Sequence, residues 1–177
     1  MMKKVLLPLL VLMLSACGAK AGNQQKADGS AAQASEAQAT AEVRTPAPQF
    51  TLNDINGAPL SLSDLKGKWV ILDFWGSWCP WCIKGFPSLK EAYKEYAGKV
   101  EILGIDCRDS QQVWKDAVKK YELPWLQVYC PDDSDLLQKY EIQGFPTKFI
   151  IDPEGNIANV TIGEDPEFFN ILKGLVK

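Results

Sequence analysis

The chain has 177 residues, a formal net charge of −3 and no histidine. Hydrophobic residues make up 46% and charged residues 23%, proportions typical of a globular domain with a packed core. A chain with a net negative charge lacks the positive surface that binds phosphate groups, which argues against a nucleic-acid partner. Without histidine, the chain cannot use a histidine general base, a histidine-ligated metal or the C-x-x-C-H haem-attachment motif.

The N-terminus has the pattern of a bacterial lipoprotein signal peptide, predicted over residues 1–16. A basic start is followed by an apolar run, Val5 to Leu14, that is too short to span a bilayer. The run ends in Leu14-Ser15-Ala16-Cys17-Gly18, which resembles a lipobox. Cleavage there would leave Cys17 as the lipidated first residue, although an ordinary signal peptide with an incidental cysteine is the alternative. Gly18 favours the outer membrane over the inner, so we expect a lipid-anchored protein on the periplasmic face.

Residues 17–48 are predicted to be a disordered tether, and residues 49–177 to be the folded domain. The tether contains almost nothing large to bury, so burial cannot offset the entropy of ordering it. Within the domain, Asn56-Gly57 favours a tight turn between two short strands. The apolar run from Trp69 to Trp75 is typical of a central strand buried on both faces.

The remaining elements alternate between helix and strand, which predicts an α/β domain with crossovers in a parallel sheet. Pro87 should bend the first helix without dividing it. The expected elements are the strands of a hairpin at 50–52 and 59–62, a helical turn at 63–67, a helix at 83–97, a strand at 100–106, a helix at 110–121, a strand at 126–129, a short helix at 135–140, a second hairpin at 148–151 and 157–162, and a helix at 166–176.

Two cysteines, Cys79 and Cys82, follow the central strand at the start of a helix, with Pro80 and Trp81 between them. This C-x-x-C arrangement is typical of a dithiol that opens and closes as a disulfide. The free N–H groups and partial positive charge of the helix N-terminus favour a thiolate at Cys79. The pattern therefore predicts thiol–disulfide chemistry.

The motif resembles the thioredoxin superfamily, in particular its TlpA/ResA-like membrane-tethered branch. The resemblance rests on the stretch from Asp73 to Cys82, on Pro87, and on Gly144-Phe145-Pro146-Thr147 before a hairpin. It implies a thioredoxin-like fold: a central mixed sheet flanked by helices, with an N-terminal β-hairpin and an inserted helix–strand unit.

The resemblance also implies roles for particular residues. Cys79 would be the exposed nucleophile and Cys82 the buried resolving thiol. Pro146 corresponds to the cis-proline of the family, and Phe145 would line the substrate groove opposite the disulfide. Of the tryptophans, we expect Trp75 in the core and Trp81 to be the most exposed. The residues expected around the groove are Trp78, Pro80, Trp81, Phe145 and Pro146.

Asp73 matches the buried acid of thioredoxins, which is proposed to take the proton from the resolving cysteine. Burial in an apolar strand would raise its pKa, which suits a base working near neutral pH. The alternative is a strand-end aspartate that caps a backbone group or meets solvent. Many relatives carry glutamate three residues after the second cysteine, where this chain has Gly85. We therefore expect a gap beside the site, with Asp73 alone in the acid–base role.

Two further cysteines, Cys107 and Cys130, end neighbouring strands. If these strands are parallel, both sulfurs lie at the same end of the sheet, where an oxidising compartment would favour a second disulfide. The alternative is two small buried thiols without a redox role.

The sequence thus predicts an extracytoplasmic thiol–disulfide oxidoreductase that acts through Cys79 and Cys82 and needs no cofactor or metal. Its expected partners are protein thiols or disulfides, a membrane electron donor and the membrane itself. The resemblance favours a reducing role, as in delivering electrons to apocytochromes during cytochrome c maturation. A net oxidase or isomerase, or a metal-binding or chaperone module, are the alternatives; a peroxidase lacks its threonine-proline-cysteine context.

Overall fold

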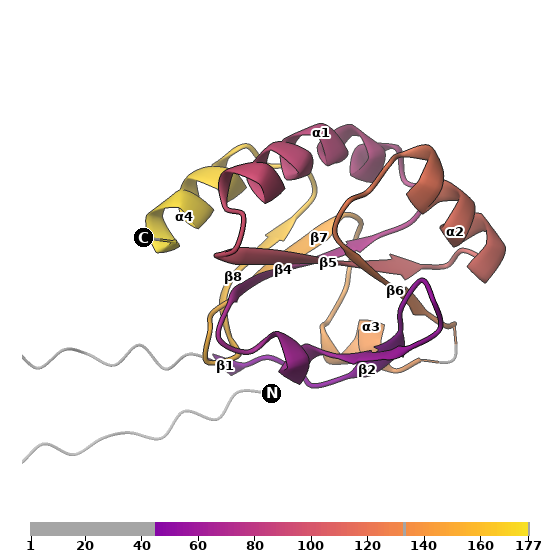
Figure 1. Ribbon diagram of the computed structural model, residues 1–177, viewed down its shortest axis with the longest axis horizontal. Helices are drawn as coiled ribbons and strands as arrows, with labels where there is room; N and C mark the ends of the chain where they lie inside the picture. Colours follow the sequence, from indigo (N-terminus) through magenta and orange to yellow (C-terminus); the bar gives the residue numbers. More distant parts are fainter. Residues whose placement is uncertain (1–44, 133, 177) are drawn as a thin grey trace, which may run out of the picture. The chain divides into compact units, whose positions relative to one another are not determined.

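A six-stranded sheet forms the centre of the part of the chain that the computed structural model describes, residues 45–132 and 134–176 (Figure 1). The strand order is β1-β8-β7-β4-β5-β6, and β2 and β3 form a separate two-stranded sheet. The strands are β1 (Thr45–Pro46), β2 (Thr51–Asn53), β3 (Pro59–Ser61), β4 (Trp69–Trp75), β5 (Val100–Cys107), β6 (Leu126–Cys130), β7 (Thr147–Ile151) and β8 (Asn156–Ile162).

The sheet is mixed, as the resemblance implied. Strands β4, β5 and β6 are parallel, whereas β7 pairs antiparallel with β4 and β8 pairs antiparallel with β7. The parallel strands therefore end at one edge of the sheet, where sites in α/β folds generally lie. The alternation of helix and strand correctly predicted the parallel part.

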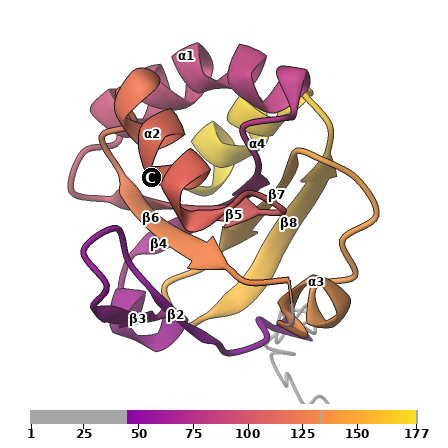
Figure 2. The same ribbon diagram turned by 90° about the vertical axis from the view of Figure 1, so that its right-hand side faces the viewer.

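Helices cover both faces of the sheet (Figures 1 and 2). The long helices α1, α2 and α4 lie on one face, and the short helix α3, the 3₁₀ helix and the β2–β3 hairpin lie on the other. The helices are the 3₁₀ helix (Leu62–Leu65), α1 (Pro80–Glu95), α2 (Gln111–Lys120), α3 (Leu136–Lys139) and α4 (Glu167–Leu175).

Strand β4 separates two apolar cores because successive side chains point to opposite faces. Ile71 and Trp75 pack under α1, while Leu72 and Phe74 pack on the other face. All four side chains are fully buried, which is why the run reads as continuously apolar. The bounds of this strand and the place of Trp75 in the core are confirmed.

Helix α1 begins at the C-x-x-C motif because its first residues suit a helix start. Cys79 is the N-cap, and Pro80 occupies the first helical position. Proline suits this position because it lacks a backbone N–H, and an N–H there would have no partner within the helix. The helix thus starts three residues before the predicted residue 83. Pro87 lies inside it without dividing it, which confirms one helix rather than two.

The predicted N-terminal hairpin is confirmed. Gly57 has a φ of +86°, a backbone conformation that glycine adopts without steric cost. The Asp54 carboxylate accepts hydrogen bonds from the N–H groups of Asn56 and Ala58, which closes the turn. Asp54 also forms a bridge to Val128, so the hairpin is linked to β6.

The predicted boundary between tether and domain at residue 49 is wrong. Thr45 and Pro46 pair with the end of β8 at Ile157 and Asn156. Ala47 is buried, and its N–H donates to the Gly155 carbonyl. The residues after Arg44 therefore belong to the fold, because backbone pairing and burial fix them.

Among the described residues, no helix combines the length and apolar character that crossing a membrane requires. The predicted signal peptide, Cys17 and most of the predicted tether lie outside the described residues.

Candidate active site

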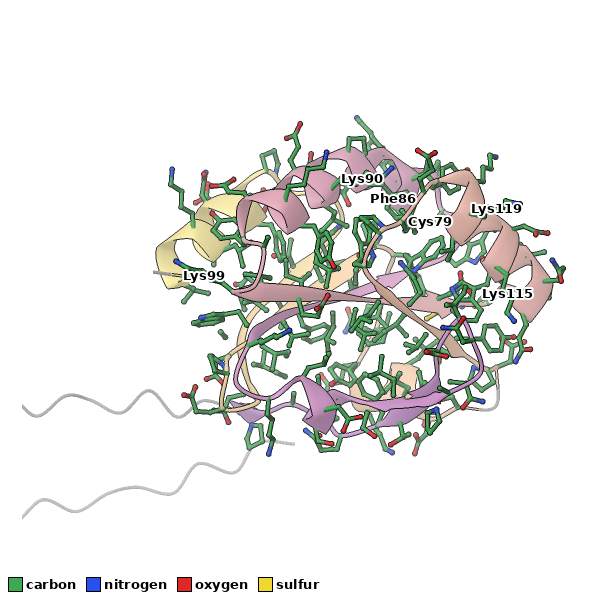
Figure 3. The ribbon with its side chains drawn as sticks, viewed as in Figure 1. Cys79, Phe86, Lys90, Lys99, Lys115 and Lys119 are labelled. Atoms are coloured by element: carbon green, nitrogen blue, oxygen red, sulfur yellow. A yellow bond between two sulfur atoms is a disulfide. The ribbon has the colours of Figure 1, made fainter. Side chains whose placement is uncertain are left out.

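Cys79 and Cys82 form a disulfide in the first turn of α1, with their Cα atoms 5.3 Å apart. The Cys82 N–H donates to the Cys79 sulfur over 3.1 Å, so that sulfur caps the helix. Figure 3 shows Cys79 near Phe86 under α1. Once reduced, a Cys79 thiolate would meet the same N–H group and the positive end of the helix dipole. The position therefore favours Cys79 as the attacking sulfur.

The expectation that Cys79 is exposed is wrong for this disulfide form. Only 3% of Cys79 and 1% of Cys82 is accessible to solvent, and both belong to the core cluster under α1. The bond to Cys82 holds the Cys79 sulfur on the inner side of the helix. Trp78 and Trp81 on either side are 44% and 57% exposed, which confirms Trp81 as the more exposed of the two. Pro80 is also exposed.

The predicted groove wall is formed by the loop before β7. The Phe145–Pro146 peptide bond is cis, as the resemblance implied. The Phe145 ring packs edge-to-face on Trp78, with ring centroids 5.1 Å apart. The structure thus brings Trp78 from the cysteine loop and Phe145 from the proline loop together into one aromatic rim.

Arg108 completes this rim, and the sequence did not predict it. Its guanidinium carbon lies 5.8 Å from the Trp78 ring centroid and 5.1 Å from that of Phe145. Arg108 is exposed and follows β5 with a φ of +66°, unusual for a residue with a side chain. An arginine directly after a buried strand end was the available signal, but its contacts with two aromatic rings depend on the fold.

The loop that carries Ser77 and Trp78 is fixed to the end of β5. Ser77 donates its N–H and its hydroxyl to the Asp109 carboxylate, over 2.6 and 2.9 Å. The Trp78 indole N–H donates to the Cys107 carbonyl over 3.0 Å. A Cβ at Gly76 would overlap the Trp78 indole and approach that same carbonyl. Sequence reasoning missed Asp109 because it lies 32 residues from Ser77.

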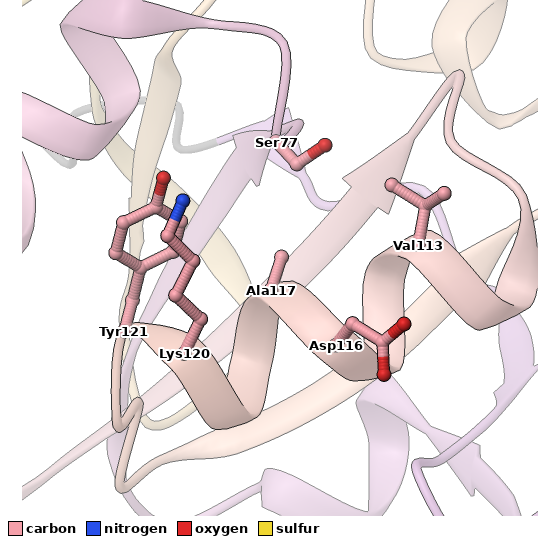
Figure 4. A pocket seen from close by; sticks show the side chains of 6 residues that line it. All are labelled: Ser77, Val113, Asp116, Ala117, Lys120 and Tyr121. Carbon is pink, nitrogen blue, oxygen red and sulfur yellow. The ribbon is translucent and has the colours of Figure 1, made fainter.

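A cavity of about 370 Å³ opens beside this loop (Figure 4). Ser77 stands on one side, and helix α2 supplies the other, with Lys120 and Tyr121 next to each other. The remaining lining residues are Val113, Asp116 and Ala117. The lining of the cavity thus combines apolar and charged groups, beside the loop that leads into the C-x-x-C motif.

Asp73 lies on the face of the sheet under α1 and is almost fully buried, as predicted. Burial raises its pKa to about 6, an effect that the positive charge of Lys148 reduces and the negative charge of Glu164 increases. Lys148 lies opposite Asp73 in the β4–β7 register, with its Nζ 3.8 Å from Asp73 Oδ1. Asp73 is therefore a carboxyl that titrates near neutral pH, as an acid–base group requires.

The predicted gap at Gly85 is wrong. A Cβ added at Gly85 would overlap the Glu164 carboxylate, which reaches this point from the loop between β8 and α4. Lys148 Nζ donates to Glu164 Oε1 over 2.5 Å. Asp73 thus has two charged neighbours that the sequence did not predict, because they come from residues 75 and 91 positions farther along the chain.

A second buried carboxyl, Asp106, lies on β5 in register with Trp75. Within the described part of the chain, neither of its oxygens has a hydrogen-bond partner. Burial and the nearby Asp109 carboxylate raise its pKa to about 9, so Asp106 is protonated at neutral pH. Asp73, in contrast, has a cation, Lys148, among its charged neighbours.

Cys107 and Cys130 are directly opposed in the β5–β6 register, as parallel neighbours, but both are free thiols. Neighbouring parallel strands place the two side chains next to each other on one face of the sheet, and no sulfur–sulfur bond joins them. Contact with Cys130 and burial raise the pKa of Cys107. The structure therefore shows the alternative, two small buried thiols, rather than a second disulfide.

No group of three or more potential metal ligands occurs among residues 45–132 and 134–176. The two cysteine pairs belong to core clusters on opposite faces of the sheet. Because the sheet separates them, the four cysteines do not converge on a common point where a zinc ion could bind.

Known proteins resemble this chain in sequence. The AhpC/TSA family matches residues 43–160. The thiol–disulfide oxidoreductase ResA of Bacillus subtilis is 37% identical over 133 residues, which cover 72% of this chain and 74% of ResA.

Solved structures agree with this comparison. The thioredoxin domain of a thiol–disulfide oxidoreductase from Bacteroides vulgatus superimposes with a TM-score of 0.70 at 34% identity, covering 75% of this chain and 96% of that domain. A putative thiol:disulfide interchange protein DsbE from Chlorobium tepidum gives a TM-score of 0.68 at 26% identity, covering 74% and 92%. Together with the Cys79–Cys82 disulfide, these comparisons identify the chain as a thioredoxin-fold thiol–disulfide oxidoreductase of the AhpC/TSA family.

Proposed function

We propose that this enzyme is an extracytoplasmic reductase of protein disulfides, held at a bacterial membrane by a lipid on Cys17. The observation that carries its chemistry is the Cys79–Cys82 disulfide at the N-terminus of α1, in a core cluster against which Phe145 packs. The lipobox-like sequence before Cys17 supports the anchor and the periplasmic location, with the outer membrane favoured over the inner.

In the reductive direction, the Cys79 thiolate attacks one sulfur of a partner disulfide. A mixed disulfide forms, and the partner's other sulfur leaves as a thiolate that takes a proton from water. The Cys82 thiol then gives its proton to Asp73, and its thiolate attacks Cys79. The partner's second sulfur leaves as a thiolate and is protonated in turn. The partner thus gains two electrons and two protons, while the enzyme is left with the Cys79–Cys82 disulfide.

Asp73 suits the role of base because its pKa of about 6 keeps it ionised at neutral pH, yet still able to accept a proton. It lies on the sheet face that packs under α1, in the same layer as Trp75 and Cys82. The exposed Trp78 and Trp81, with Phe145 and Arg108, provide the surface for the partner protein.

To complete a cycle, a membrane electron donor must return two electrons to the Cys79–Cys82 disulfide. The resemblance to the TlpA/ResA-like branch favours the reducing direction, with apocytochromes or other specific protein thiols as substrates. Similarity to a thiol–disulfide oxidoreductase and to a thiol:disulfide interchange protein supports the exchange chemistry itself. The alternative direction, a net oxidase or isomerase, uses the same disulfide. Reduction potentials within this fold span about 150 mV, or about 7 kcal/mol for two electrons, so the potential decides the direction.

The deciding experiment equilibrates the protein with glutathione buffers and measures the potential of the Cys79–Cys82 pair. A reductase is expected near the thioredoxin value of about −270 mV, whereas a value near −120 mV would make the enzyme an oxidant. Insulin reduction with dithiothreitol as the electron source tests turnover. Metal analysis of the purified protein tests the remaining alternative, a metal-binding module, and we expect no bound zinc or copper.

A further inference from the structure

Three charged side chains from distant parts of the chain meet beside the active-site helix. Asp73 comes from β4, Lys148 from β7, and Glu164 from the loop between β8 and α4. The side chains of Asp73 and Lys148 are 2% and 3% exposed, and that of Glu164 is 20% exposed. Two buried charges and one partly buried charge in an apolar core are costly unless they compensate one another. The unfavourable energy of burying these charges suggests that the cluster has a functional role.

The backbone at Gly85 makes room for this arrangement. Gly85 lies three residues after Cys82, on the same buried side of α1. The Glu164 carboxylate occupies the place where a side chain at residue 85 would begin. Any residue other than glycine would have to displace it. The carboxylate thus lies one helical turn from the resolving cysteine.

Glu164 also competes with Asp73 for the positive charge of Lys148. Lys148 Nζ is 2.5 Å from Glu164 but 3.8 Å from Asp73, so the cation is paired mainly with Glu164. Among the described residues, the charged groups that act on Asp73 in this disulfide form are Lys148 from β7 and Glu164 from the loop after β8. Without Glu164, the full charge of Lys148 would act on Asp73.

We propose that Glu164 is a positioning residue for thiol exchange: lodged in the space left by Gly85, its carboxylate holds Lys148 and so sets the basicity of Asp73. This inference builds on the proposed role of Asp73 as the base for Cys82. It also explains the glycine at position 85, because a side chain there would occupy the space of the Glu164 carboxylate. Glu164, the most exposed of the three groups, also places the cluster next to solvent.

The direct test follows the titration of the Asp73 carboxyl by carbon-13 NMR in the oxidised protein. In Glu164→Gln, the midpoint should fall by about one pH unit, because the unshared cation favours ionised Asp73. Lys148→Met should raise the midpoint, since a carboxylate neighbour remains without the cation. Opposite shifts in the two variants would not follow from a merely structural role.

Two further variants serve as a second test and as a control. Gly85→Ala keeps every charge but displaces the Glu164 carboxylate, so it should lower the midpoint as Glu164→Gln does. Glu167→Gln removes an exposed acid three residues farther along and should leave the midpoint unchanged. Circular dichroism confirms that each variant is folded. Wild-type midpoints in both Glu164→Gln and Gly85→Ala would overturn the inference.

Activity measurements separate this inference from the proposed function. If Asp73 is the base, the pH profile of insulin reduction should move with the NMR midpoint in each variant. A midpoint that shifts without any change in the pH profile would leave Glu164 as the residue that sets Asp73, but would refute Asp73 as the base. That result would contradict the proposed mechanism and confine the effect of Glu164 to electrostatics.

Discussion

Two pairs of cysteines lie on opposite faces of one sheet, and only one pair is placed for exchange. Cys79 and Cys82 occupy the first turn of α1, next to the aromatic rim of Trp78 and Phe145 that Arg108 contacts. Cys107 and Cys130 end β5 and β6 and pack under α3 and the N-terminal hairpin. All four are buried, so burial alone does not distinguish them. The difference lies in the backbone around the sulfurs.

A helix N-terminus offers free N–H groups to a thiolate, whereas a strand end within an apolar core does not. The Cys79 sulfur already accepts a hydrogen bond from the Cys82 N–H. The Cys107 thiol donates instead to the Ile105 carbonyl, a contact that suits a neutral thiol. The position of a cysteine in the fold therefore determines its chemistry more than its accessibility does.

The largest effect is expected from Cys79→Ser. Loss of the attacking thiolate should lower insulin reduction by at least about a hundredfold, because a serine hydroxyl stays protonated at this site. The matched control is Cys107→Ser, which removes a cysteine from the other face and should retain nearly full activity. Equal losses in the two variants would contradict the distinction between the pairs.

Cys82→Ser should stop the reaction at its midpoint. Cys79 can still attack a partner disulfide, but no resolving thiol remains to release the product. A covalent adduct between the variant and insulin or another disulfide substrate should accumulate and disappear on adding dithiothreitol. Non-reducing gel electrophoresis measures it, and Cys130→Ser should show no such adduct. A Cys82→Ser enzyme that turns over freely would refute the assignment of the resolving thiol.

Asp73→Asn should slow resolution of the mixed disulfide by about a hundredfold, the lower end of general-base effects. The rate in the wild type should rise with pH through the Asp73 pKa of about 6, since the ionised carboxylate is the base. The variant should lack this step in the profile. Stopped-flow measurement from pH 5 to 8 tests the prediction, and an unchanged profile would remove Asp73 from the mechanism.

Asp106→Asn should stabilise the protein at alkaline pH. The folded-state pKa of Asp106 is about 9, above the unfolded value of 3.8, so its contribution to stability is complete below about pH 4 and is lost progressively as pH rises to 9. Asparagine cannot ionise and can donate to the nearby Asp109. Urea unfolding at pH 8 should show a gain of about 1 to 3 kcal/mol. No gain at pH 8 would mean that the buried Asp106 carboxyl does not destabilise the folded state.

The smallest effect on activity is expected from replacing both thiols of the second pair. In the Cys107→Ser, Cys130→Ser double variant, insulin reduction should stay within about twofold of wild type. Two buried hydroxyls are more polar than thiols, so the free energy of unfolding should fall by about 1 to 3 kcal/mol. Activity and urea unfolding are measured on the same preparation. A large loss of activity without a loss of stability would give this pair a chemical role.

Much of the fold followed from local patterns. The run from Trp69 to Trp75 predicted β4 to the residue, and Asn56-Gly57 predicted the hairpin turn. The start of the domain was missed because Thr45-Pro46 resembles a stiff linker and is a strand only by pairing with β8. Short edge strands depend on a partner that the local sequence does not contain.

The site was predicted where a motif carries it and missed where distant residues complete it. The C-x-x-C motif and the family resemblance pointed to Cys79, Cys82, Asp73 and Pro146, and the structure has the disulfide, the buried carboxyl and the cis bond expected there. Glu164 was missed, and Gly85 was given the wrong consequence, because the missing side chain is supplied by a loop 79 residues later. Asp109 and Arg108 were not predicted either, because their partners Ser77 and Phe145 are remote in sequence.

The central claim, that Cys79 and Cys82 are the redox pair and Cys107 and Cys130 are not, is tested most directly by a redox titration with peptide mapping. The native protein is equilibrated in glutathione buffers, alkylated and digested, and each cysteine is scored by mass. Cys79 and Cys82 should convert together in a single two-electron transition, while Cys107 and Cys130 remain thiols throughout. A disulfide involving Cys107 or Cys130 in the same range of potentials would contradict the account.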